Sequence, residues 1–152
     1  MFVTHEKIAV EFLLDDLNDL VRSHCDLIAT YEDAQKHVRS TQLKSLLDQL
    51  RLDHRVNIKL LGQLVADHGG QLNDSPDVGQ MQQKLRVVFG SLLSDGAVIR
   101  AVHNAEAKLL QEYTRSINNL TYIPGLEAVL ESNRLATQRR QSRLQIAISL
   151  DD

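Results

Sequence analysis

The chain has 152 residues, of which 43% are hydrophobic and 24% are charged. This composition is typical of a folded globular domain and excludes a disordered or collagen-like chain. Seventeen basic and 20 acidic residues give a net charge of -3, so no overall positive field attracts nucleic acid or an anionic membrane. The length fits one domain, and we expect residues 1–152 to form a single domain.

The single cysteine, Cys25, is typical of a protein from a reducing compartment. It rules out an internal disulfide bond and a zinc cage built from several cysteines. The N-terminal residues lack the charged and then apolar layout of a signal peptide, and no stretch approaches the roughly 18 apolar residues of a membrane span. We therefore expect a soluble cytoplasmic protein.

Long segments rich in Leu, Ala, Gln, Glu, Lys and Arg, with only two prolines and seven glycines, predict an all-α protein. The first helix is expected to begin after Thr4 and to run to about Val38, with apolar residues every three or four positions. Ser40 provides an N-cap for a second helix, which ends at Gly69 and Gly70. The connection between these helices is so short that they must pack as an antiparallel hairpin.

A short third helix is expected over residues 77–93, and a fourth helix begins near Asp95 and ends at about Ile117. Pro124 opens the last helix. At 1.5 Å per residue the short helix spans about 25 Å, enough to carry the chain back along the bundle, so that the fourth helix runs parallel to the second. This crossover predicts a ferritin-like four-helix bundle with a short extra helix between the second and third long helices.

Several segments together carry a resemblance to a known family. They are Leu17-Asn18-Asp19-Leu20, Tyr31-Glu32-Asp33-Ala34, the segment from Leu61 to Gly70, the short crossover helix, and Glu106 with Tyr113. Over about Ile8 to Ile148 the chain resembles a bacterial family of ferritin-like four-helix proteins that is known chiefly as a domain of unknown function. The resemblance implies a compact ferritin-like bundle and no established chemistry.

Polar residues occupy inward positions whose heptad neighbours are leucines, and burying such groups costs roughly 1–3 kcal/mol each unless they find partners. The first hairpin brings His54 near His24, and the hairpin of the last two helices brings Glu106 near Asn133. With the second and fourth helices parallel, all of these residues lie at one height. The predicted polar layer consists of His24, His54, Asn57, Glu106 and Asn133.

The first interpretation of this layer is structural. Its histidines, acid and amide, with Tyr31 or Tyr113, would form a buried hydrogen-bond network that fixes the register of the helices. The segment from Arg134 to Arg143 carries four arginines and no acid. We expect it to form a solvated helix face rather than a contact with the phosphates of nucleic acid.

The second interpretation is a mononuclear metal site. Its ligands would be His24, His54 and Glu106, a set that suits iron or zinc. A dinuclear iron centre is not expected, because such bundles use Glu on two helices and Glu-x-x-His on the other two. This chain has His54-x-x-Asn57 instead, and Arg139 and Arg140 in the last helix would repel cations.

No nucleophile and base at catalytic spacing, phosphate-binding glycine loop or His-Glu-x-x-His helix occurs in the chain. We therefore expect a non-catalytic bundle that acts by self-association or by binding an unknown protein, in stress physiology by analogy with some ferritin relatives. The alternative is a metal-dependent redox or metal-binding bundle with iron or zinc as cofactor. The second helix also carries apolar residues outside its main seam, and this wider apolar surface predicts a homodimer through the first hairpin. These residues are Leu46, Leu52, Ile58 and Leu60.

Overall fold

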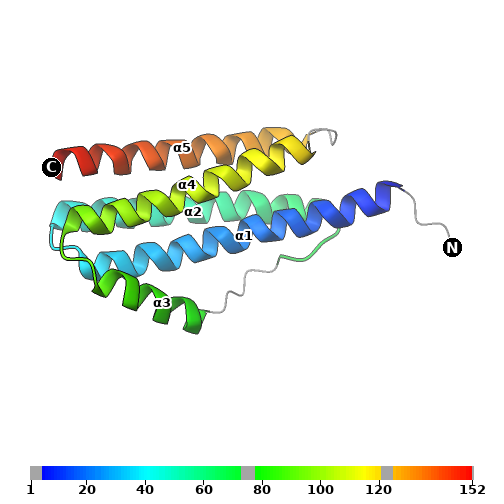
Figure 1. Cartoon of the computed structure of the whole chain (residues 1–152). Helices are drawn as coiled ribbons and strands as arrows, with labels where there is room; N and C mark the ends of the chain where they lie inside the picture. The colour runs from blue at the N-terminus through cyan, green and yellow to red at the C-terminus, as the bar shows by residue number, and fades with distance from the viewer. Residues whose placement is uncertain (1–4, 73–77, 121–124, 152) are drawn as a thin grey trace.

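The computed structural model describes residues 5–72, 78–120 and 125–151, and this part of the chain is helical with no strand (Figure 1). The helices are α1 (His5–His37), α2 (Thr41–Asp67), α3 (Val78–Gly90), α4 (Asp95–Leu120) and α5 (Leu126–Asp151). The all-α prediction is confirmed, and the helices lie within a few residues of the expected positions. Thr4 and Pro124, which were expected to precede the first and last helices, lie outside the described residues.

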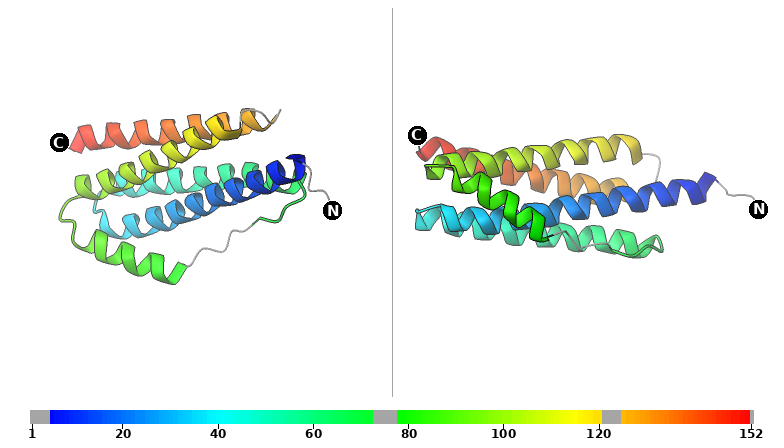
Figure 2. Two further views of the ribbon diagram at one scale, coloured as in Figure 1. Left: turned by 45° about the vertical axis from the view of Figure 1, so that its right-hand side comes forward. Right: turned by 60° about the horizontal axis from the view of Figure 1, so that its bottom comes forward.

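The four long helices lie side by side with α3 against α1, as the views in Figures 1 and 2 show. α1 and α2 form an antiparallel hairpin, α4 and α5 form a second one, and the two hairpins meet where α1 packs on α4 and α2 on α5. α4 begins at the same end as α2 and runs in the same direction. The segment that contains α3 therefore returns the chain along the bundle, as the expected crossover requires.

The ends of α2 follow the local signals in the sequence. The Ser40 hydroxyl accepts a hydrogen bond from the backbone N–H of Leu43 at 3.2 Å, which satisfies one of the free donors of the first turn. Beyond the helix, Gly69 has a φ of 78°, a left-handed conformation that suits glycine. The N–H of Gly70 then donates to the carbonyl of Val65 at 2.9 Å and closes the last turn.

Asp95 at the start of α4 joins the two hairpins. Its carboxylate accepts hydrogen bonds from the backbone N–H groups of Arg39 and Ser40, at 2.8 and 3.0 Å. These amides belong to the tight turn between α1 and α2, where the backbone has few partners of its own. The turn is thereby held against the neighbouring helix.

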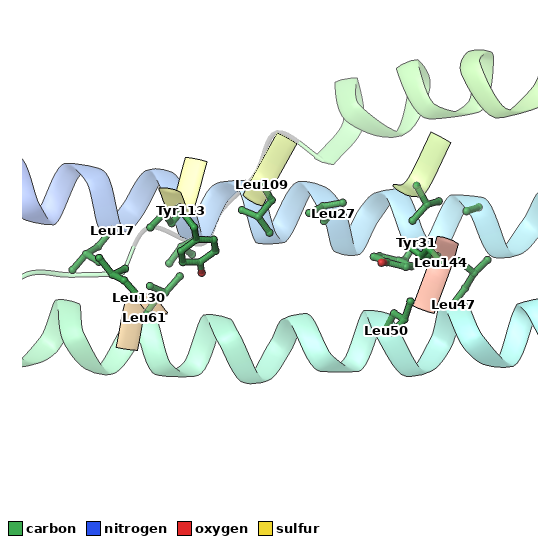
Figure 3. Close-up of a cluster of buried hydrophobic side chains, with 14 of the residues drawn as sticks. Leu17, Leu27, Tyr31, Leu47, Leu50, Leu61, Leu109, Tyr113, Leu130 and Leu144 are labelled. Carbon is green, nitrogen blue, oxygen red and sulfur yellow. The ribbon is translucent and has the colours of Figure 1, made fainter. Parts of the chain in front are cut away.

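The apolar core contains two groups of side chains separated along the bundle (Figure 3). One group comprises Leu17, Leu61, Tyr113 and Leu130, and the other comprises Tyr31, Leu47, Leu50 and Leu144, all of them buried. Leu27 and Leu109 connect the two groups on the side of α1 and α4. The polar layer lies between these groups, since His54 and Asn57 of α2 come between Leu50 and Leu61, and Asn133 and Arg140 of α5 come between Leu130 and Leu144.

No helix in the described part of the chain combines the length and the apolar character that crossing a bilayer requires.

Candidate functional site

The candidate site is the polar layer in the middle of the core. Its members come from all four long helices and are at most 4% exposed; they are His24, His54, Asn57, Glu106, Asn133, Thr137 and Arg140, with the hydroxyls of Tyr31 and Tyr113. All five residues that the sequence predicted for this layer are in it. Such a concentration of polar groups in a core is tolerated only if they are paired.

Five of these side chains form a row of hydrogen bonds across the bundle. Tyr113 Oη lies 2.6 Å from His24 Nε2, and His24 Nδ1 lies 2.8 Å from His54 Nδ1. On the other edge of its ring, His54 Nε2 lies 2.5 Å from Glu106 Oε1. Tyr31 donates its hydroxyl proton to the same carboxylate oxygen at 2.7 Å. The row therefore runs from one tyrosine to the other through two imidazoles and a carboxylate.

The partners at the two ends determine where each proton lies. The amide of Asn133 donates to Tyr113 Oη at 3.0 Å, so we assign the tyrosine hydroxyl as donor to His24 Nε2. A neutral His24 then carries its proton on Nδ1 and donates to His54 Nδ1. His54 is left with its proton on Nε2, which donates to the ionised carboxylate of Glu106. Each hydrogen bond in the row thus has one proton.

Arg140 supplies the positive charge of the layer and is 1% exposed. Its Nε donates to Glu106 Oε1 at 3.0 Å. Nη1 donates to Asp53 at 2.8 Å and to the side-chain oxygen of Asn57 at 2.9 Å, and Nη2 donates to Thr137 at 3.0 Å. The guanidinium therefore neutralises a buried carboxylate and joins α5 to α2 and α4. Asp53, whose side chain is 46% exposed, extends the network to the surface.

Burial and the neighbouring charges together set the pKa values of the layer. Burial lowers the pKa of His24 well below its ordinary value, and repulsion from His54 and Arg140 adds to this. Burial also lowers the pKa of His54, although attraction to Glu106 opposes the shift. For Glu106, burial alone would raise the pKa, but the contact with His54 and the charge of Arg140 hold it below its usual value. At neutral pH both imidazoles are uncharged and the carboxylate is ionised, which agrees with the proton assignment.

A protein-family model described as a domain of unknown function, DUF2383, matches residues 13–119, more than two thirds of the chain. The chain belongs to the DUF2383 family. The search of curated proteins and the search of solved structures find no match.

The DUF2383 match covers only part of the polar layer. The row from Tyr113 through His24, His54 and Glu106 to Tyr31 lies within residues 13–119. The donors on α5, which include Arg140, lie beyond the matched residues. The layer of this DUF2383 protein is thus completed by a helix that the family model does not reach.

The three predicted metal ligands lie together, but they form a row rather than a cage. His54 turns one ring nitrogen to His24 and the opposite one to Glu106, and Glu106 Oε1 accepts three hydrogen bonds, one of them from Arg140. Within residues 5–72, 78–120 and 125–151, no three His, Cys, Asp or Glu side chains are arranged to hold a metal ion. A metal site at His24, His54 and Glu106 stays a prediction.

The sequence interpretation is wrong for Arg140, which was expected on a solvated face with its neighbours. Arg139 and Arg143 are exposed as expected, whereas Arg140 is buried. One signal could have identified it: the inward stripe of α5 has a gap between Ala136 and Leu144, and Arg140 occupies the position four residues before Leu144. Thr137 and Asp53 carried no comparable signal.

Proposed function

We propose that this DUF2383 protein is a non-catalytic helical bundle that acts by binding, either to a second copy of itself or to another protein. One observation carries the proposal: the reactive side chains of the core are enclosed, and each is hydrogen-bonded to another member of the layer. Among the described residues, Glu106 Oε2 and Asn133 Oδ1 are the atoms of the layer that are buried without a hydrogen-bond partner. His24, His54 and Glu106 are 0% exposed. A catalytic acid or base must come within hydrogen-bond reach of its substrate, and these groups reach only the side chains of the layer.

The layer has a structural role in this proposal. Sliding α4 or α5 along the bundle by a turn would separate the buried carboxylate of Glu106 from the guanidinium of Arg140. Breaking a buried ion pair in this way costs about 3–5 kcal/mol. The layer therefore selects one arrangement of the helices, and the outer surface of the bundle is left for binding.

We further propose that the connectivity is ferritin-like. The parallel course of α2 and α4, joined through α3, supports this assignment. The shared connectivity carries no activity with it, because the same bundle serves different functions in different proteins.

Elemental analysis tests the proposal against a metal-dependent function. Protein purified without chelator at pH 7.5 is expected to contain far less than one iron or zinc ion per chain. Its melting temperature is expected to stay the same when excess zinc or a chelator is added, because only a ligand that binds the folded state raises it. Stoichiometric metal that disappears in His54→Ala would contradict the proposal. A large rise in the melting temperature of the unmodified protein when zinc is added would contradict it as well.

A further inference from the structure

α2 presents an exposed apolar stripe on the side that faces away from the core. Leu52, Val56 and Leu60 are 49%, 56% and 39% exposed, and their four-residue spacing places them in one line along the helix. Leu46 and Ile58, which were expected to belong to the same surface, pack partly against the core instead. The stripe is therefore narrower than the sequence predicted.

Two opposite charges lie beside this stripe. Asp48 is half-exposed, with an ion pair to Arg51 at 2.8 Å on its own helix, and Lys59 is exposed. They are eleven residues apart, which is three helical turns, so both lie on the same side of α2. The midpoint between them falls between Asp53 and His54.

We propose that two copies of the chain pair along α2 in antiparallel orientation, about a two-fold axis at this midpoint. This inference rests on the proposed binding function and names the partner. The axis places Asp48 of each copy opposite Lys59 of the other. It also brings Leu52 of each copy within one residue of Val56 of the second copy, a shift of about 1.5 Å along the helix. A two-fold contact needs such a self-complementary surface.

The orientation follows from the charges. A parallel pair would place Asp48 against Asp48 and Lys59 against Lys59, and like charges at a contact are unfavourable. Arg55 lies on the same side of α2 and is exposed. In the antiparallel pair it comes opposite Leu52 of the second copy, where its alkyl stem can cover the leucine.

The neighbouring helix limits the size of the contact. Arg139 and Arg143 of α5 are exposed, and Arg143 bonds Gln49 of α2 at 2.8 Å, so these arginines border the stripe. A contact broad enough to include α5 would place the arginines of one copy against those of the other, and like charges at a contact are unfavourable. The contact therefore follows α2 alone over residues 48–60, about 18 Å. Stable interfaces bury at least about 1,200 Å², and a contact along a single helix is small by comparison. We therefore expect a reversible dimer that dissociates on dilution.

Sedimentation of the full-length protein over a dilution series tests the pairing. We expect a dimer at high concentration, and Val56→Glu is expected to weaken it at least about tenfold. Asp48→Lys and Lys59→Asp should each weaken it by a similar factor, because each creates two like-charge contacts. The control is Lys108→Asp, which makes the same change of charge as Lys59→Asp. Lys108 lies on α4 at the groove between α1 and α4, so this variant should leave the dimer intact.

The decisive variant carries both Asp48→Lys and Lys59→Asp. It reverses both charges and restores the pairs, so its dimerisation should recover to near that of the original protein. A protein that stays monomeric at every concentration would overturn the pairing. A dimer whose dissociation constant is unchanged by Val56→Glu would overturn it too, as would a double variant that dimerises as weakly as the single variants. None of these results bears on the metal content, which tests the proposed function separately.

Discussion

Arg140→Met tests whether the buried guanidinium holds the layer together. Methionine keeps much of the side-chain volume but removes the charge and all the hydrogen-bond donors. The carboxylate of Glu106 would then remain buried, at 0% exposure, without the cation that now lies 3.0 Å away. The variant therefore separates the charge from the packing.

The expected loss of stability follows from the burial of both partners. Removing one member of a buried ion pair costs about 3–5 kcal/mol, because the remaining charge is uncompensated. A domain of this kind has a total stability of about 5–15 kcal/mol. At about 2–4 °C per kcal/mol for this chain length, the melting temperature should fall by about 6–20 °C.

Urea unfolding followed by circular dichroism at pH 7.5 measures the loss. Arg139→Met is the matched control, because Arg139 is the adjacent arginine and is exposed, and it should stay within about 0.5 kcal/mol of the original protein. The defect of Arg140→Met should shrink when Glu106→Gln is added, since no buried charge then remains. If Arg140→Met were as stable as Arg139→Met, the reasoning would be refuted.

Three further predictions follow from the layer and the hairpin turn. Burial lowers the pKa values of His24 and His54 in the folded protein, so below about pH 6.5 the unfolded chain binds more protons than the folded one. The free energy of unfolding is therefore highest above that pH, and below it falls by up to about 1.4 kcal/mol per pH unit for each histidine. Urea unfolding at pH 7.5 and 5.0 measures this, and equal stability at both values would contradict it. Tyr113→Phe should cost about 1–3 kcal/mol, since it leaves His24 Nε2 without its donor; an unchanged melting temperature would speak against the proton assignment. Asp95→Ala should speed hydrogen exchange of the amides at 39–40, which lose their acceptor, and unchanged exchange rates would show that the carboxylate does not protect them.

The helices were predictable because their signals are local. The Ser40 N-cap and the left-handed Gly69 mark the ends of α2 in both sequence and structure. The end of α4 was less certain from sequence: the chain was expected to leave the helix after Ile117, but α4 continues to Leu120. Asparagine at 118–119 lowers helix propensity without forbidding the helix.

The residues that form the layer were largely predictable, whereas the hydrogen bonds between them were not. A short turn fixes which residues of two antiparallel helices lie level, and this brought His24 to His54 and Glu106 to Asn133. The burial of Arg140 depends on Glu106 across the bundle, and its one sign in the sequence is the gap in the inward stripe of α5 between Ala136 and Leu144. The order of the hydrogen bonds depends on the side-chain conformations, which the spacing of residues does not specify.

In this account the layer is a buried network of two neutral imidazoles around the carboxylate of Glu106, whose charge Arg140 compensates. Nitrogen-15 NMR of the histidine rings at pH 7.5 tests this description most directly. We predict that both rings are uncharged, with the proton of His24 on Nδ1 and that of His54 on Nε2. A doubly protonated ring, or ring nitrogens with the shifts of metal coordination, would contradict the account.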